Sequence, residues 1–199
     1  MALPRSTPFE PHPVALKATI YKVNLGIADM DRGIYVEQPL TIARHPSETD
    51  ERLMLRLLAW GLHRPANDDA GALEFAKGLW DTDEPELWRK DLTGRILHWI
   101  EIGQPDDKRI LRACGRADRV TVLSYSASTS IWWAGIAGKL ARTTNLDIWQ
   151  IGSESSLALA GLAQRSMQLQ LSVQDGTAWV SETAGAVEIT PVRLHPSAA

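Results

Sequence analysis

Two glutamates near the middle of the chain have the residue type expected of ligands for a divalent cation. Glu101 stands in the segment HWIEIGQP (98–105), where the alternation of a β-strand places it on one face with Leu97 and Trp99. A charge in such apolar surroundings costs several kcal/mol unless it is paired. We therefore expect Glu101 either to lie at an open strand end or to hold a partner such as a cation. The second glutamate, Glu86, stands in the segment PELW.

A hairpin would bring these two carboxylates together. If residues 86–91 and 96–103 form neighbouring strands, Glu86 and Glu101 converge near one point. Two carboxylates in one cleft repel each other unless a divalent cation bridges them, and magnesium favours such a site. The pattern predicts a Mg²⁺ site, with Mn²⁺ as a substitute, held by Glu86 and Glu101.

Further acids and a lysine flank this pair in the sequence. Glu48, Glu51 and Leu55 are spaced for one face of a helix, which places both carboxylates at its N-terminus facing the sheet. Acids in a first helical turn also stabilise the helix dipole without any function, and this alternative stays open. Lys108, in the next expected helix, is placed to reach back over the strand end near Glu101 and to orient a water or neutralise negative charge.

The helix that carries Lys108 also carries a row of arginines. Arg109, Arg112 and Arg116 recur at helical spacing. They predict either a stripe that contacts nucleic-acid phosphates or the solvated outer face of an ordinary amphipathic helix.

Alternating and helical patterns define the elements that must position these residues. We expect strands at 15–29 and 34–44, a helix at 48–62 capped by Ser47, a short strand or turn at 72–80, a hairpin of 83–91 and 96–103 turning at Gly94, a helix at 105–117, a strand at 119–125, a helix at 128–142, a strand at 146–152, a helix at 153–164 capped by Ser153, and three strands in 167–194. This order predicts an α/β fold with one mixed β-sheet flanked by helices and antiparallel strands at both ends of the chain.

Length and composition fit one domain. The chain has 199 residues, a net charge of −3 and 44% hydrophobic residues, so no overall positive charge points to nucleic acid. We assign 15–193 to the domain, 1–14 to a flexible proline-rich leader and 194–199 to a tail. The single cysteine, Cys114, is expected to be a small core residue on the apolar side of a helix. Most of the tryptophans are also expected in the core.

Several function classes lack their motifs. The chain has no GxGxxG, HExxH or G-x-S-x-G sequence, and GIAGKLA (135–141) does not complete a phosphate-binding loop. There is no apolar run long enough for a membrane helix and no secretory signal pattern. We expect a cytoplasmic protein that does not contact membranes.

Taken in order, six segments resemble the YaeQ family of small bacterial proteins. They are ALKATIYK, LTIARHPSETDERLMLRLLAW, DEPELW, WIEIGQPDDKRI, IWW and QDG, and the resemblance covers roughly 15–193. It implies a variant of the PD-(D/E)XK nuclease fold. In that pattern Glu51 or Glu48 takes the place of the helix acid, Pro85-Glu86 that of Pro-Asp, and Glu101 that of the acid in the last motif.

One position departs from the nuclease pattern. Gly103 stands where the resemblance implies a lysine, so Lys108 is our candidate for a lysine that has moved onto the helix. The implied activity is Mg²⁺-dependent hydrolysis of nucleic-acid phosphodiesters. The alternative is a catalytically inactive nuclease fold that binds nucleic acid or a protein partner in a regulatory role. The sequence does not determine whether the nucleic acid would be DNA or RNA, nor the oligomeric state of the protein.

Overall fold

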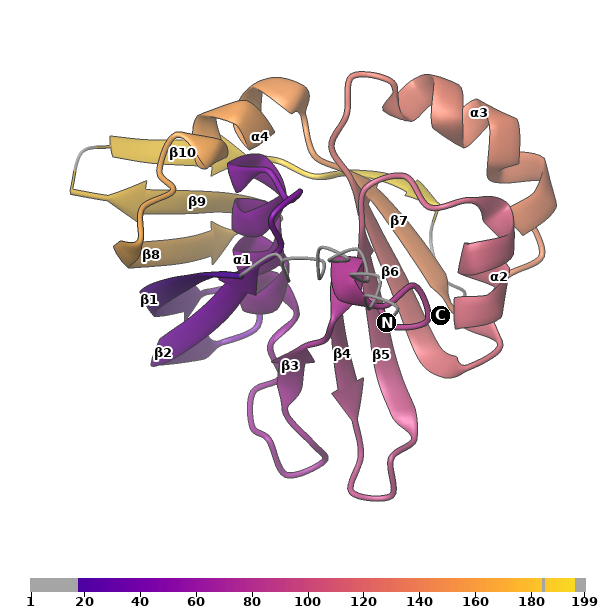
Figure 1. Ribbon diagram of the computed structural model, residues 1–199, viewed down its shortest axis with the longest axis horizontal. Helices are drawn as coiled ribbons and strands as arrows, with labels where there is room; N and C mark the ends of the chain where they lie inside the picture. The colour runs from indigo at the N-terminus through magenta and orange to yellow at the C-terminus, as the bar shows by residue number, and fades with distance from the viewer. Residues whose placement is uncertain (1–17, 184, 196–199) are drawn as a thin grey trace, which may run out of the picture.

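The computed structural model describes residues 18–183 and 185–195, which form four α-helices and two mixed β-sheets (Figure 1). The helices are α1 Asp50–His63, α2 Asp107–Cys114, α3 Thr129–Leu140 and α4 Ser153–Ala160, with a 3-10 turn at Gly78–Trp80. The first sheet has the order β10-β9-β8-β1-β2 and contains β1 Thr19–Asp29, β2 Ile34–Arg44, β8 Ser166–Gln174, β9 Thr177–Glu182 and β10 Gly185–Ile189. The second has the order β11-β7-β6-β5-β4-β3 and contains β3 Leu73–Phe75, β4 Leu87–Lys90, β5 Ile96–Ile102, β6 Ala117–Ser124, β7 Leu146–Gln150 and β11 Val192–His195.

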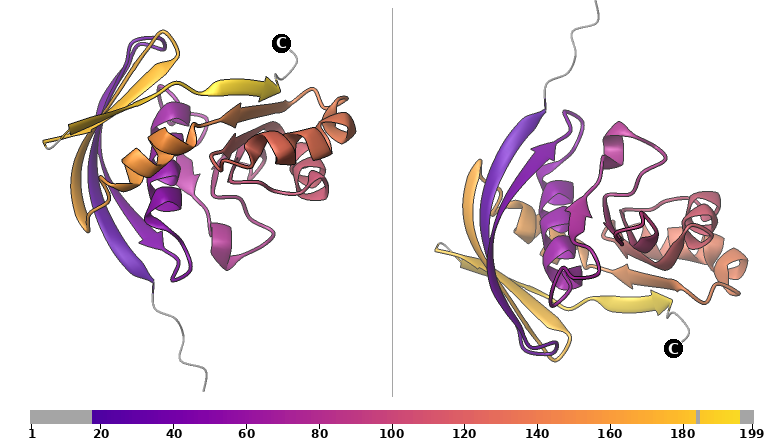
Figure 2. Two further views of the ribbon diagram at one scale, coloured as in Figure 1. Left: turned by 90° about the horizontal axis from the view of Figure 1, so that it is seen from above. Right: turned by 90° about the horizontal axis from the view of Figure 1, so that it is seen from below.

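Helix α1 lies between the two sheets and forms the centre of the larger core. Every residue from Leu53 to Gly61 is buried, because the helix packs against both sheets rather than against one. Figure 2 shows the five-stranded sheet curved around α1 and α4, while α2 and α3 cover the far face of the six-stranded sheet. A second core lies under α2 and α3, and the half-buried Cys114 packs against it as expected.

The expectation of a single mixed sheet is wrong. Strand β1 pairs in parallel with β8, from Lys22↔Ser166 to Asp29↔Val173, so strands from opposite ends of the chain build a separate sheet. Its strands bury alternate residues, as a sheet with one solvated face should. Strands β5 and β6 are buried on both faces over most of their length, because helices lie on both sides of them.

Local pairings follow the sequence pattern closely. Strands β1 and β2 form the expected antiparallel hairpin, and β4 and β5 form the second hairpin with Gly94 in its turn. Gly94 has φ +87°, a conformation that other residues rarely adopt. The segment 72–80 contains both the short strand β3 and the 3-10 turn. In the part of the chain that is described, no helix is long and apolar enough to cross a membrane.

Element ends differ from the sequence expectations. The N-cap of α1 is Thr49 rather than Ser47, since Thr49 Oγ1 accepts a hydrogen bond from the Arg52 amide at 3.2 Å. The N-cap of α4 is Gly152, so Ser153 is the first helical residue. Helix α2 is shorter than 105–117, and β11 includes residues 194 and 195, which the sequence led us to place in the tail. The expected leader, 1–14, lies outside the described residues.

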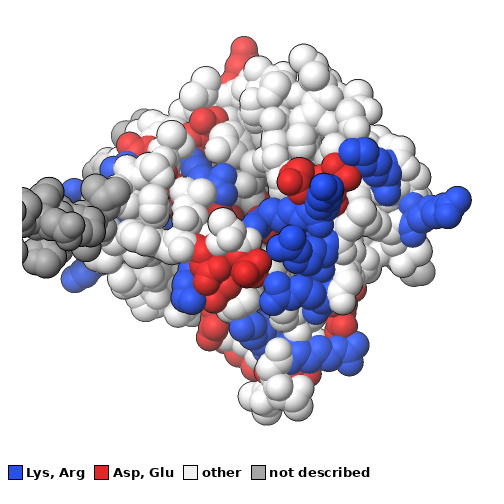
Figure 3. All heavy atoms as spheres, turned by 45° about the vertical axis from the view of Figure 1, so that its right-hand side comes forward, with Lys and Arg blue, Asp and Glu red and all other residues white. Residues whose placement is uncertain are grey.

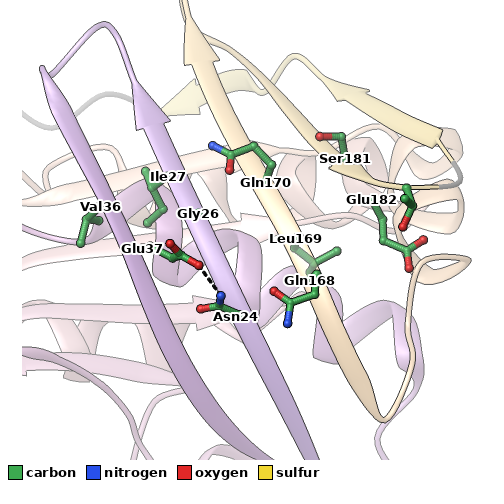
Figure 4. A pocket seen from close by; sticks show the side chains of 11 residues that line it. Asn24, Gly26, Ile27, Val36, Glu37, Gln168, Leu169, Gln170, Ser181 and Glu182 are labelled. Carbon is green, nitrogen blue, oxygen red and sulfur yellow. Dashed lines mark hydrogen bonds between the residues drawn. The ribbon is translucent and has the colours of Figure 1, made fainter.

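The solvated face of the five-stranded sheet carries a polar hollow of about 520 Å³ (Figure 4). Amide side chains of Asn24, Gln168 and Gln170 line it, and Asn24 Nδ2 donates a hydrogen bond to Glu37 Oε1. A Cβ at Gly26 would lie only 2.2 Å from Gln170 Oε1, so glycine leaves room for that amide. No residue that the sequence marked as a site candidate lines this hollow.

Candidate functional site

Glu86 and Glu101 line one cleft of about 280 Å³. Its walls come from the first turn of α1, the 3-10 turn, the end of β5 and the start of α2. The Glu86 amide donates to the Ile100 carbonyl at 3.1 Å, which extends the β4–β5 pairing by one residue and fixes Glu86 beside β5. Each glutamate is 3% exposed. The hairpin therefore brings the two carboxylates to one place, as the sequence indicated.

The Glu86 carboxylate is paired with two arginines of α1. Arg52 Nη2 donates to Glu86 Oε1, and Arg56 Nε lies 3.3 Å from Glu86 Oε2. Arg56 is itself 5% exposed. Its Nη1 donates to both Glu48 oxygens at 3.1 Å. Arg56 thus joins two buried carboxylates, and both depend on it for their charge balance.

The Glu101 carboxylate is paired with an arginine of α2. Arg109 Nε and Nη2 donate to its two oxygens at 2.8 and 3.1 Å, and Trp99 Nε1 donates to Oε1 at 2.7 Å. Arg109 also donates to the carbonyls of Thr82 and Glu84. This side chain therefore balances Glu101 and holds the segment before Glu86 against α2.

The two candidate helix acids lie away from the cleft. Glu48 precedes the N-cap of α1, and its carboxylate accepts from the His45 amide at 3.0 Å in addition to Arg56. Glu51 lies in the first turn, and its Oε1 accepts from Ser156 Oγ on α4 at 2.6 Å. Neither residue lines the cleft: Glu48 is separated from Glu86 by the Arg56 guanidinium that both contact, and Glu51 is bound to α4.

The candidate lysine does not occupy the expected place. Lys108 is exposed on α2, and the position beside Glu101 belongs to its neighbour Arg109. Gly103, where the nuclease pattern has lysine, has φ +106°, and a Cβ there would lie 3.2 Å from Arg52 Nη1. The cationic groups of the cleft therefore come from two helices instead of from the strand.

Arg112 in α2 and Arg116, which follows the end of α2 and is not on the helix as expected, hold the segment that precedes Glu86. Arg112 Nη1 donates to Asp83 Oδ1 at 3.3 Å, and Arg116 Nη1 donates to the Asp83 carbonyl at 3.3 Å. Arg116 also lies over the Trp99 ring, 5.1 Å from its centre. The side chain of Arg112 is still 62% exposed, so these contacts leave its surface accessible.

The carboxylates as arranged do not fit a magnesium site. Magnesium takes oxygen ligands together with several waters, whereas each cleft carboxylate here already accepts from a guanidinium group. Within residues 18–183 and 185–195, no three acidic, histidine or cysteine side chains are placed to hold one metal ion. A divalent ion would have to displace Arg52 or Arg109 from its partner.

Four residues of this site were not singled out from the sequence. Arg52 and Arg56 stand in the run ERLMLRLLAW, where two arginines among buried residues were the available signal. Leu79 and Trp80, in the 3-10 turn beside the cleft, are 43% and 46% exposed. Trp80 packs edge-on against His45, with ring centres 4.3 Å apart, whereas Trp60 and Trp99 are buried as expected.

Replacing Glu101 by glutamine is expected to change how stability depends on pH. Burial raises the pKa of the Glu101 carboxyl above its ordinary value, and hydrogen bonds from Arg109 and Trp99 offset burial only in part. The folded state thus disfavours the charged form. The free energy of unfolding of the wild type, relative to Glu101→Gln, should fall as pH rises from the ordinary glutamate pKa through the raised one. Urea denaturation of both proteins from about pH 4 to pH 7 measures this, and a pH-independent difference would contradict it.

One family model matches nearly the whole chain. It is the model described as YaeQ protein, and it matches residues 14–191. This chain belongs to the YaeQ family. The YaeQ relative from Escherichia coli (strain K12), described as uncharacterized, is 43% identical over 178 residues, which cover 88% of this chain and 95% of the relative. The relative from Salmonella typhi, described in the same way, is 44% identical over 178 residues with the same coverage.

Crystal structures of two YaeQ proteins share the fold. The protein from Xanthomonas axonopodis pv. citri has a TM-score of 0.85 and 42% identity, covering 90% of this chain and 99% of the other. The protein from Pseudomonas syringae has a TM-score of 0.84 and 36% identity, covering 90% of this chain and 97% of the other. The arrangement of two mixed sheets and four helices is therefore that of YaeQ proteins.

Proposed function

We propose that this YaeQ protein binds the phosphodiester backbone of nucleic acid beside its carboxylate cleft and does not cut it. The observation that carries this proposal is the internal pairing of both cleft carboxylates. Glu86 is paired with Arg52 and Arg56, and Glu101 is paired with Arg109. A nuclease cleft needs unpaired carboxylates to attract its metal ion. Here the protein supplies the countercharge itself, which in a variant of the PD-(D/E)XK fold would take the place of the metal ion.

Exposed basic side chains beside the cleft support binding to a polyanion. Lys108 and Arg112 on α2, and Arg116 just after its C-terminal end, are all exposed. Figure 3 shows Lys and Arg gathered on the face that turns forward with α2, beside a smaller group of acidic side chains. Basic groups in such a row contact phosphates without reading the sequence of bases.

An exposed aromatic ring next to the cleft supports the same function. Trp80 is 46% exposed in the 3-10 turn and follows Leu79, which lines the cleft; Trp80 itself lines the neighbouring pocket with Arg56 and Lys77. Aromatic side chains stack on unpaired bases with little preference for sequence. A single strand that follows α2 would bring its bases toward Trp80, so we expect single strands to bind better than duplexes.

The second candidate function is Mg²⁺-dependent hydrolysis of nucleic-acid phosphodiesters. It is favoured by the location of Glu86 and Glu101 in one cleft and by their mutual repulsion, which is one of the smaller contributions to the raised pKa of Glu101. It requires Arg52 and Arg109 to leave these carboxylates when an ion arrives.

Fluorescence anisotropy with a labelled single-stranded DNA of about 20 nucleotides tests the proposal. In EDTA at low salt, the wild-type protein should bind this DNA, and affinity should fall steeply as salt is added. The double reversal Lys108→Glu/Arg112→Glu should weaken binding about tenfold or more, because two phosphate contacts become repulsive. The control Lys22→Glu, a single reversal on the exposed face of β1, should bind within about twofold of wild type.

Three other results of these assays would contradict the proposal. Cleavage of the same DNA with Mg²⁺, lost in Glu101→Gln, would overturn the non-cutting proposal in favour of hydrolysis. Absence of binding to single-stranded and double-stranded DNA in EDTA, with no cleavage in Mg²⁺, would contradict both functions. The α2 reversal changes the net charge by four units and Lys22→Glu by two, so a binding free energy lost in that two-to-one ratio would mean that binding reflects net charge alone.

A further inference from the structure

A second cleft, of about 450 Å³, lies between the two sheets at the C-terminal end of α1. Its apolar walls include Leu62 of α1, Leu123 and Trp149 of the six-stranded sheet, and Val173 of the five-stranded sheet. Pro191 closes it from the segment that passes from β10 in one sheet to β11 in the other (Figure 1). A largely apolar cavity of this size with a few polar groups is the usual form of a small-molecule site.

Two arginines share one buried aspartate beside this cleft. Asp147 on β7 is 0% exposed, and its Oδ2 accepts from Arg119 Nε and Nη2 at 3.2 and 3.1 Å. Its Oδ1 accepts from Arg193 Nη2. Arg119 lines the cleft, and Arg193 lies over the Trp149 ring at 5.2 Å. The aspartate thus orients two guanidinium groups with a single negative charge, so this cluster of Asp147, Arg119 and Arg193 carries a net positive charge.

The acidic residues of the cleft are engaged elsewhere. Asp29 is 1% exposed and accepts from the Arg32 amide at 2.9 Å and from Arg32 Nε at 2.6 Å. Asp31 accepts from the amides of Asp175 and Gly176 at 2.8 and 2.9 Å, which fixes the β8–β9 turn at the rim. Asp175 itself is exposed, where water and salt screen its charge. Asp29 is thus neutralised by Arg32, whereas Asp31 and Asp175 keep their charges at the exposed rim, where water and salt screen them.

A neutral histidine completes the polar part of the wall. His63 lines the cleft, and its buried Nε2 has no hydrogen-bond partner among the described residues. Its ring packs edge-on against His98 with centres 5.2 Å apart. Burial lowers the pKa of His63 well below its ordinary value and that of His98 to about 3, so both rings are uncharged at neutral pH. Of the two arginines that line the cleft, Arg32 is engaged by Asp29 and by the Arg64 and Gly61 carbonyls, so Arg119 is the cation left to face a ligand.

We infer that this second cleft binds a small carboxylate with an apolar body, the carboxylate on Arg119 and the body between Leu123 and Val173. Arginine binds carboxylates through paired hydrogen bonds, and a guanidinium that is already oriented loses little entropy in doing so. The hydrogen bonds from Arg119 to Asp147 use Nε and Nη2, and the Arg119 side chain is 50% exposed. The glutamate cleft shares no lining residue with this one, so the inference is independent of nucleic-acid binding.

An NMR titration of the full ¹⁵N-labelled chain with 2-naphthoate tests this inference. The neutral isostere 2-naphthamide is titrated in parallel at pH 7. We expect 2-naphthoate to shift the amides of Leu62, Gly176 and Thr190, which line the cleft. We expect 2-naphthamide to bind at the same place at least tenfold more weakly, because it cannot form the ionic pair with Arg119. Equal affinities, shifts confined to other regions, or no shift at millimolar ligand would each overturn the inference.

Two variants test separately whether binding needs the Arg119 charge and whether it takes place in this cleft. Arg119→Gln should weaken 2-naphthoate about tenfold and leave 2-naphthamide unchanged, while Arg95→Gln, in the exposed pair with Asp118, should change neither. If loss of Arg119 unfolds the protein around Asp147, the second variant is Thr190→Trp. Thr190 is exposed at the rim, so tryptophan there can fill the cleft without touching the buried pair. It should abolish binding of both compounds, and unchanged binding would overturn the inference.

Discussion

Replacing Arg56 by methionine is expected to lower the free energy of unfolding by about 3–5 kcal/mol. Arg56 is 5% exposed and joins the buried carboxylates of Glu48 and Glu86. Methionine keeps an unbranched apolar stem against Phe75, whose ring lies 5.4 Å from the guanidinium, so the loss comes from the charge rather than from a large cavity. Breaking a buried ion pair costs more than the pair contributes, because the remaining charge stays in low dielectric.

Urea denaturation measures this loss of stability. Two further variants test whether the loss comes from breaking a buried ion pair. Arg95→Met removes an exposed arginine from its pair with Asp118, and it should cost at most about 1 kcal/mol. Adding Glu48→Gln to Arg56→Met should recover part of the stability, since it removes one of the two buried carboxylates that have lost their Arg56 partner. A loss for Arg56→Met no larger than for Arg95→Met would contradict the central role of Arg56.

Replacing Gly78 by alanine is expected to cost about 3–4 kcal/mol, combining backbone strain with displacement of a buried charge. Gly78 has φ +53°, and a Cβ there would lie 2.5 Å from Glu86 Oε2 and 2.9 Å from its Cδ. A carboxylate at the end of a free side chain would move aside at little cost. The Glu86 carboxylate is held between Arg52 and Arg56, so moving it breaks both pairs.

Gly33→Ala is the matched control for this variant. Gly33 has φ +66°, and a Cβ there would have no neighbouring atom within 4 Å, so alanine adds backbone strain alone, about 1–2 kcal/mol. The difference between the two variants in urea denaturation then reports on Glu86, and we expect about 2 kcal/mol. Equal losses would mean that Glu86 moves freely and that the arginines hold it weakly.

The sequence was most informative where the interactions are local. Alternation placed β1 and β2, and Gly94 marked the turn between β4 and β5, because a turn with positive φ requires a particular residue. The pairing of β1 with β8 was not predictable in the same way. Both strands alternate correctly for a half-buried sheet, but nothing within either segment specifies a partner from the other end of the chain.

In the candidate site too, local features were predictable from the sequence, and features that depend on the tertiary fold were not. Convergence of Glu86 and Glu101 followed from one hairpin, so the sequence was sufficient to predict it. The sequence placed Lys108 over the strand end near Glu101, whereas the neighbouring Arg109 lies there, because side-chain direction on a helix depends on where the helix begins. Helix α2 begins after Asp106, whose carboxylate accepts from the Arg109 amide at 2.7 Å, and not at residue 105. Pairing of Glu48 with Arg56 needs the fold of the 45–48 turn, which residue spacing alone does not give.

The position of α1 between two sheets has a consequence for synthesis on the ribosome. Helix α1 emerges early, yet β8 and β11, which extend the two sheets that enclose it, come from the last part of the chain. Until β8 is made, β1 has an open edge and the apolar sides of α1 lack their final cover. Such exposed edges and apolar surfaces favour aggregation in partly made chains. We therefore expect the nascent chain to be most prone to aggregation until β8 has been made.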